Sequence, residues 1–147
     1  MEARAEDNLR ELAKSLANDL DTKVAFICEV CDDRRERART VALYVDHDYL
    51  DNIEYDLAGT PCAGVYDEGV LIHTADTSKI YPSDHILQEW SIESYMGVPF
   101  YDGDGKLIGH VGVMDDTRRK NIGDSRPTLE KAAAHVCREM LRRKQSR

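Results

Sequence analysis

The sequence predicts an α+β domain in which an antiparallel β-sheet is packed against amphipathic helices from both ends of the chain. Apolar residues recur at helical spacing near each terminus, and four β-prone runs lie between the two helical segments. Two of these runs flank a tight Asp-Gly turn, which joins neighbouring strands as a hairpin. Hairpin connections produce antiparallel pairing, and the apolar stripe of each helix then needs a sheet face or another chain to cover it.

The first helix is expected over residues 4–20. Charged residues fill the positions between its apolar ones, so that one face is apolar and the other is polar. The apolar stripe consists of Leu9, Leu12, Ala13, Leu16, Ala17 and Leu20.

Two strands, 24–28 and 40–45, follow this helix and are joined by a polar loop over residues 32–39. Acidic residues in the loop offset its arginines, which favours a solvated loop over an anion site. The arginines are Arg34, Arg35, Arg37 and Arg39.

The middle of the chain, residues 46–90, is the least regular part. Short apolar pieces at 53–57 and 70–74 are separated by glycines and prolines. Ser83 is the expected N-cap of a short helix that has Asp84 in its first turn and reaches to about Trp90. Because long irregular connections in compact domains often carry function, we expect the segment from Gly59 to Trp90 to fold over the sheet and leave a cavity.

The last part of the chain is expected to form a hairpin and a helix. Strands at 94–101 and 107–114 flank a turn at 102–105, which is a turn and not a calcium loop because Phe100 and Val111 would occupy ligand positions. Asp124 or Ser125 would cap the final helix, with Pro127 near its first turn. Its apolar stripe consists of Leu129, Ala132, Ala133, Val136, Cys137, Met140 and Leu141.

The composition favours a globular protein that does not bind nucleic acid. The 147 residues include 20 Lys and Arg against 28 Asp and Glu, a formal net charge of −8, whereas phosphate backbones are bound by clustered cations. The sequence shows no apolar run of membrane-spanning length and no apolar signal region at its start, so we expect a cytoplasmic location and no membrane insertion. The four cysteines are scattered and are expected to be reduced thiols.

Four segments resemble the GAF domain family, in particular the GAF modules of bacterial multidomain signalling proteins. They lie at residues 55–62, 81–84, 93–100 and 105–115. The last two contain Ser-Tyr-x-Gly-Val-Pro and Gly-x-Leu-Ile-Gly-His-x-x-Val, and their spacing matches the family as well as their residues do. Gly97, Gly109 and Gly112 fall inside the expected strands, where glycine suggests a bulge or tight packing against the backbone.

The resemblance implies one GAF domain over residues 1–147, with an N-terminal helix at 1–22, a sheet and pocket core at 23–123 and a C-terminal signalling helix at 124–147. The implied fold is a GAF-like antiparallel sheet of about six strands, with the terminal helices on one face and a pocket on the other. The implied function is a regulatory sensor module that binds a small molecule or relays a signal through its terminal helices to an output domain. A homodimer formed through those helices is also expected. No cofactor is expected, and the sequence does not identify the small-molecule ligand.

Tyr66, His73, Tyr81 and Tyr95 are the expected lining of the pocket. Tyrosine and histidine can be partly buried and still offer hydrogen bonds to a small ligand. Trp90 and His110 are placed in or beside the same region, and a hydrogen-bonded core histidine is the alternative interpretation of the latter. No catalytic or metal-binding set is expected.

The cysteines suggest an alternative function, a stand-alone cysteine-dependent enzyme that reduces free methionine sulfoxide. Cys28 and Cys31 form a C-x-x-C, but on a strand their thiols would diverge, which favours structural cysteines over a metal or redox pair. A branch of the GAF family reduces free methionine sulfoxide with cysteines near the position of Cys62, but no second cysteine lies between Cys62 and Cys137 to resolve a disulfide. A cysteine buried at a helix start is therefore preferred, and a ligand-free dimerisation module is the third hypothesis.

Overall fold

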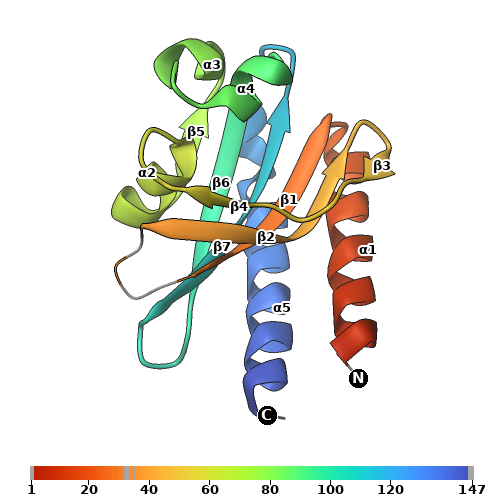
Figure 1. Cartoon of the computed structure of the whole chain (residues 1–147). Helices are drawn as coiled ribbons and strands as arrows, with labels where there is room; N and C mark the ends of the chain where they lie inside the picture. The colour runs from red at the N-terminus through yellow and green to blue at the C-terminus, as the bar shows by residue number, and fades with distance from the viewer. Residues whose placement is uncertain (1, 32–33, 35, 146–147) are drawn as a thin grey trace.

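The computed structural model describes residues 2–31, 34 and 36–145, and its centre is an antiparallel β-sheet (Figure 1). Over these residues the sheet has seven strands in the order β3-β2-β1-β7-β6-β5, and β4 also pairs with β2. The strands are β1 Val24–Val30, β2 Arg37–Val45, β3 Asp48–Tyr49, β4 Glu54–Asp56, β5 Leu71–His73, β6 Ser94–Tyr101 and β7 Leu107–Asp115. The expected α+β fold is confirmed.

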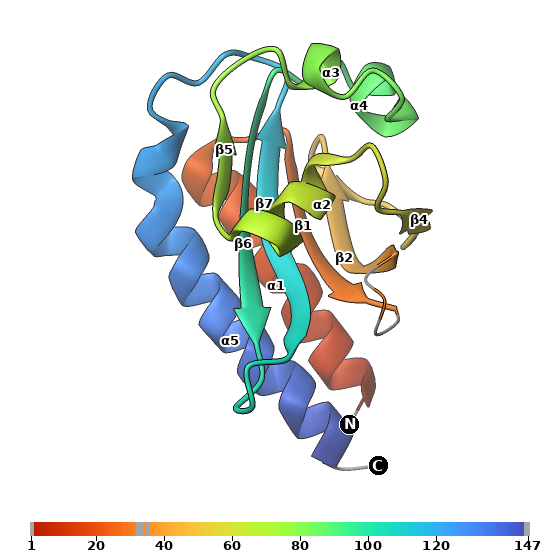
Figure 2. The same ribbon diagram turned by 90° about the vertical axis from the view of Figure 1, so that its left-hand side faces the viewer.

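Helices cover both faces of this sheet (Figures 1 and 2). The long helices α1 and α5 run along one face and contact each other, whereas α2 packs on the other face against β5, β6 and β7. The helices are α1 Glu2–Leu20, α2 Pro61–Glu68, α3 Thr77–Ile80, α4 His85–Glu89 and α5 Arg126–Gln145, and a 3-10 turn, η1 Ile122–Ser125, precedes α5.

The core on the face of α1 and α5 contains both predicted apolar stripes. Leu9, Leu16, Leu129 and Val136 are at most 3% exposed and belong to one cluster with side chains of β1, β6 and β7. Burial of each leucine contributes roughly 1.5–3 kcal/mol, so this layer supplies much of the stability. The two terminal helices therefore pair within the chain, and a dimer formed through them stays a prediction.

The second core lies between the opposite sheet face and the middle of the chain. Phe26, Val65, Leu87 and Tyr95 are buried there, contributed by β1, α2, α4 and β6. Because the irregular middle supplies two of these side chains, it is anchored to the sheet at both ends. It therefore covers this face of the sheet.

Two glycines of β7 lie where the sheet is most crowded. A Cβ on Gly109 would stand 2.0 Å from the carbonyl oxygen of Cys28, and one on Gly112 would stand 2.3 Å from the ring of Phe26. Both distances are far inside van der Waals contact. The expectation of tight packing against these strand glycines is confirmed.

The charged loop after β1 is shorter than predicted. Residues 32, 33 and 35 lie outside the described part, but β2 already begins at Arg37, so the prediction that the loop continues to Arg39 was wrong. Arg37 pairs with Glu54 at 3.0 Å and also with Asp56 of β4, while Arg39 pairs with Glu29 of β1 at 2.6 Å. Cross-strand ion pairs thus allow a polar sequence to form a strand.

The N-cap of the short helix in the middle of the chain also differs from the prediction. Asp84, not Ser83, caps α4, because its Oδ1 accepts hydrogen bonds from the N–H groups of Ile86 and Leu87. The helix is accordingly one residue shorter at its start and ends at Glu89. The helix that begins at Pro61 agrees with the interpretation of Cys62 as a buried cysteine at a helix start.

At the C-terminal end, η1 occupies residues where a helix cap was predicted. Asp124 and Ser125 belong to this 3-10 turn, and Pro127 is the second residue of α5. The hairpin turn is as expected: Oδ1 of Asp102 accepts the N–H groups of Asp104 and Lys106, both at 2.9 Å. Over the described chain, no helix combines the length and apolarity that crossing a membrane requires.

Candidate functional site

A cavity of about 400 Å³ lies between the sheet and the segments that cover it. Its floor is formed by β1 and β2, through Phe26, Cys28 and Leu43, and by Met114 of β7. Its walls come from residues within 53–62 and 83–90, which include two residues of β4, the start of α2 and the first three residues of α4. The expected cavity under the middle segment is thus present in the structure, and its use as a ligand site stays a prediction.

A chain of sulfur and phenol groups crosses the cavity wall. The Tyr55 hydroxyl donates to Cys62 Sγ at 3.3 Å and lies 3.4 Å from Cys28 Sγ. Because the phenol has one hydrogen, the Cys28 thiol is the donor in the second contact. Cys62 Sγ also lies 3.5 Å from the hydroxyl of Tyr95. The four side chains come from four separate elements, so they hold the roof and the sheet together.

Burial makes both cavity thiols weak acids. It raises the pKa of Cys62 to about 11, despite the hydrogen bonds with Tyr55 and Tyr95, which act in the other direction. Burial likewise raises the pKa of Cys28 well above its ordinary value. Since the thiolate is the nucleophile, both groups are poorly reactive at neutral pH.

The four predicted lining residues are not all in one place. Tyr95 lines the cavity, whereas Tyr66, His73 and Tyr81 lie outside its lining. Tyr66 is 4% exposed in the core beneath α2, where its hydroxyl lies 2.5 Å from Nδ1 of His110. His73 Nε2 and the Tyr81 hydroxyl form a separate, half-buried hydrogen bond of 2.9 Å beside β5. A role of these residues in ligand binding stays a prediction.

His110 is a hydrogen-bonded core histidine, as the alternative interpretation held. It is fully buried on β7, between the ring of Phe26 and the ring of Tyr66, and its Nε2 has no hydrogen-bond partner among the described residues. Burial lowers the pKa of His110 to about 3, so the imidazole is neutral at physiological pH.

The titratable groups of the cavity wall, apart from the thiols and phenols, are the carboxylates of Asp56 and Asp84 and the imidazole of His85. Asp56 pairs with Arg37 at the rim, whereas Asp84 lies half-buried in the wall and carries no ion pair among the described residues. Oδ1 of Asp84 is occupied by the α4 cap, and Oδ2 makes no hydrogen bond with the described chain. Burial raises the pKa of Asp84, although the two backbone hydrogen bonds oppose this shift.

Two residues of the sulfur and phenol chain, Cys28 and Tyr55, had no predicted place in the site. Cys28 was considered only with Cys31, yet it contacts the same phenol as Cys62, and Cys31 lies beyond β1 with its thiol 3.7 Å from Glu54. Tyr55 was part of a family segment without an assigned role. The alternation of residues 53–57 could have placed it, because Ile53 and Tyr55 share one face of a strand and both line the cavity.

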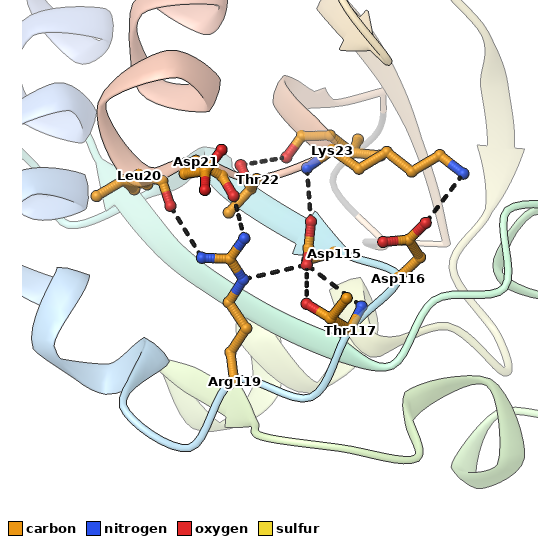
Figure 3. Close-up of polar contacts among 9 residues, drawn as sticks. Leu20, Asp21, Thr22, Lys23, Asp115, Asp116, Thr117 and Arg119 are labelled. Atoms are coloured by element: carbon orange, nitrogen blue, oxygen red, sulfur yellow. Dashed lines mark hydrogen bonds and ion pairs between the residues drawn. The ribbon is translucent and has the colours of Figure 1, made fainter.

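A polar cluster at the end of β7 connects the cavity region with α1 (Figure 3). Asp115 accepts hydrogen bonds from the Lys23 backbone N–H at 2.8 Å and from Nε of Arg119 at 3.1 Å. Arg119 also donates to the carbonyl oxygens of Leu20, at 3.1 Å, and Asp21. Burial alone would raise the pKa of Asp115, but these partners and Thr117 hold it below its ordinary value.

No group of three His, Cys, Asp or Glu side chains suited to a metal ion occurs among the residues described. Nor do the described contacts assemble a nucleophile with a general base. The cavity is therefore a hydrogen-bonded, mostly apolar space with a carboxylate in its wall, and this combination is typical of small-molecule sites.

Comparison with known proteins identifies the family. The GAF domain family matches residues 4–139. The chain belongs to the GAF domain family. GAF domains typically serve as sensor or regulatory modules. Among proteins of curated function, none matches this sequence.

Solved GAF-type structures share the fold at low identity. The GAF domain of the Acinetobacter phosphoenolpyruvate-protein phosphotransferase is 16% identical with a TM-score of 0.72, covering 97% of this chain and 85% of that one. A red/green cyanobacteriochrome in its red light-absorbing state is 13% identical with a TM-score of 0.74, covering 97% of both chains. The free methionine-R-sulfoxide reductase of Neisseria meningitidis, solved with its substrate, is 16% identical with a TM-score of 0.69, covering 97% and 81%.

Proposed function

We propose that this GAF domain is a regulatory sensor module that binds a small molecule in the cavity and passes its occupancy to the terminal helices. The observation that carries the proposal is the cavity itself. It is formed by segments from both halves of the chain, and its wall has mostly apolar side chains with a few directed hydroxyl and carboxyl groups. A homodimer through the terminal helices and an output domain on a longer chain complete the proposal.

A route from the cavity to α1 supports the relay. Trp90 and Met114 line the cavity, the Trp90 carbonyl accepts a hydrogen bond from Lys23 Nζ at 3.5 Å, and Asp115 follows Met114 directly. Through Arg119, Asp115 is connected to the carbonyls at the C-terminal end of α1 (Figure 3). A ligand that displaces Trp90 or Met114 would therefore shift the end of this helix.

We also propose that the chain is not itself an enzyme. The thiols that could serve a sulfoxide reductase, Cys28 and Cys62, have raised pKa values and lie within a hydrogen-bond chain with tyrosines. Cys62 does lie at the N-terminal end of α2 and lines the cavity, but burial outweighs this placement and keeps its pKa raised, whereas activation of a cysteine requires a lowered pKa.

Ligand binding can be tested by a thermal-shift screen of metabolites with the full chain. A ligand at a hundredfold excess over its Kd adds about 2.7 kcal/mol of stability, which corresponds to an increase in Tm of roughly 5–10 °C. Ala58→Phe, which fills the exposed mouth of the cavity, should remove the shift, and Ala134→Phe on the exposed side of α5 should retain it. A screen without any stabilising compound, or a shift that survives Ala58→Phe, would contradict the proposal.

The relay needs a separate measurement. Hydrogen exchange of α1 should slow when a stabilising compound binds, and Arg119→Gln should abolish this response while retaining binding. Arg118→Gln is the matched control, because the Arg118 side chain is 70% exposed and its ion pairs within the described chain are with Asp76 and Glu93. An α1 response that is equal in both variants would show that the Asp115 cluster does not carry the signal.

A further inference from the structure

The charges and rings of the cavity limit the kind of molecule that it can bind. We propose that the ligand is a small organic cation, an amine on an apolar or aromatic body, whose ammonium group pairs with Asp84. This inference rests on the proposed function and specifies the ligand class of the same cavity.

The charge of the cavity wall disfavours anionic ligands and favours cationic ones. Asp56 and Asp84 are the carboxylates of the lining, and neither Lys nor Arg contributes to it. Arg37 pairs with Asp56 from outside the lining, whereas Asp84 carries no ion pair among the described residues and has only the His85 imidazole beside it in the wall. An anionic ligand would thus meet a like charge in a partly desolvated space, whereas a cation would pair with it.

Asp84 also has a free acceptor for such a group. Its Oδ1 holds the N-terminus of α4 through Ile86 and Leu87, but Oδ2 has no hydrogen-bond partner in the described chain. The carboxylate is therefore fixed in position by the helix cap and can still accept a hydrogen bond. An ammonium group at this oxygen would form a charge-assisted hydrogen bond, the stronger kind of polar contact.

The remainder of the cavity suits an apolar or aromatic body. Phe26, Tyr55, Trp90 and Tyr95 all contribute to the lining, together with two cysteines and a methionine. Aromatic faces attract both flat rings and cations. A volume of about 400 Å³ lies at the lower end of the range for small-molecule pockets, so a one-ring or two-ring amine fits and a large tetrapyrrole does not.

The test compares probes that share a body and differ in charge. Tryptamine, tryptophol and indole-3-acetate carry an ammonium, a hydroxyl and a carboxylate on the same ring system, and phenethylamine, 2-phenylethanol and phenylacetate form a smaller series. We expect an amine to bind about tenfold more tightly than its alcohol by calorimetry, and the carboxylates not to bind.

The variant Asp84→Asn isolates the carboxylate. Asparagine is as good an N-cap as aspartate, so α4 should be retained, which circular dichroism and Tm can check. The amine should lose about tenfold in affinity and match its alcohol, whose own affinity should not change. Glu89→Gln removes one negative charge from the same helix outside the lining and should leave the preference for the amine intact.

The outcomes separate this inference from the proposed function. An alcohol or carboxylate that binds as tightly as its amine, or an amine preference that survives Asp84→Asn, overturns the ligand class and leaves the cavity as a binding site. The ligand class is also overturned if both amines fail to bind while the metabolite screen finds an anion or a neutral compound. If neither the probes nor the screen yields a ligand, both the ligand class and the proposed function fail.

Discussion

The buried histidine of β7 predicts how stability depends on pH. His110 is neutral in the folded protein because burial lowers its pKa to about 3, whereas a histidine in an unfolded chain titrates near 6.5. The unfolded state therefore binds a proton that the folded state does not bind at any pH between these two values. The stabilising effect is complete above about pH 6.5 and is lost progressively as the pH falls toward 3.

The expected size follows from these two pKa values. Between pH 7 and pH 5 the folded form of His110 stays neutral while the unfolded form becomes protonated, which lowers the free energy of unfolding by about 2 kcal/mol. Burial also lowers the pKa of the half-buried His73, so that residue contributes in the same direction. A variant is therefore needed to isolate His110.

Urea unfolding at pH 5 and pH 7 measures the effect, with fluorescence of Trp90, the single tryptophan, as the signal. His110→Gln keeps a polar group near the Tyr66 hydroxyl but cannot titrate. It should be less stable than the original chain at pH 7, yet its loss of stability between pH 7 and pH 5 should be smaller by about 2 kcal/mol. His135→Gln, at an exposed position on α5, is the matched control and should retain the original dependence.

Equal pH dependence of the original chain and His110→Gln would refute the reasoning, because it would mean that His110 takes up its proton without unfolding. A change of the same size in His135→Gln would refute it as well. In either case the buried Tyr66–His110 pair would not be the source of acid sensitivity.

The other predictions concern packing, the polar cluster and the thiols. Gly109→Ala should prevent folding or reduce stability by more than about 3 kcal/mol, because its Cβ would meet the backbone oxygen of Cys28, whereas Gly103→Ala in the open turn should have little effect on urea unfolding. Arg119→Gln should cost about 2 kcal/mol, since it removes charge-assisted hydrogen bonds to a buried carboxylate and two carbonyls, and a melting temperature equal to that of the original chain would contradict this. Cys28 and Cys62 should react with a thiol reagent at pH 7 only when the protein unfolds, because both thiols are buried and have raised pKa values. For the same reason the chain should not turn over free methionine sulfoxide. Turnover that Cys62→Ser abolishes would refute the non-catalytic proposal.

The sheet and the terminal helices could be predicted because their information is local. Apolar residues at helical spacing define the stripes of α1 and α5, and the Asp-Gly turn fixes the β6–β7 hairpin. The glycines inside strands also correctly predicted tight packing, because Gly109 and Gly112 lie against the Cys28 carbonyl and the Phe26 ring. These signals do not depend on how distant segments meet.

The cavity was harder to predict because its wall is assembled from distant segments. Nothing near Cys62 in the sequence indicates that Cys28 shares its tyrosine, since only the folded chain brings both thiols to the Tyr55 hydroxyl. Likewise, Tyr66 has the same polar tip as Tyr95, but the orientation of α2 directs it toward His110 and away from the cavity. Side-chain chemistry indicated which residue types suit the site, whereas the helix orientations decided which residues line it.

The strand order has a consequence for self-association. The long apolar strands β1 and β7 are interior, β6 is paired with β5 over Tyr95–Gly97, and the sheet ends in β3, of two residues, and β5, of three. Residues 50–53, which connect β3 with β4, also form backbone hydrogen bonds with β2. The Leu50 N–H donates to the Leu43 carbonyl, and the Thr40 N–H donates to the Ile53 carbonyl. Short and covered edges offer few free N–H and C=O groups to an added strand. The short outer strands thus limit edge-to-edge growth of the sheet, even though its central strands are among the most apolar segments of the chain.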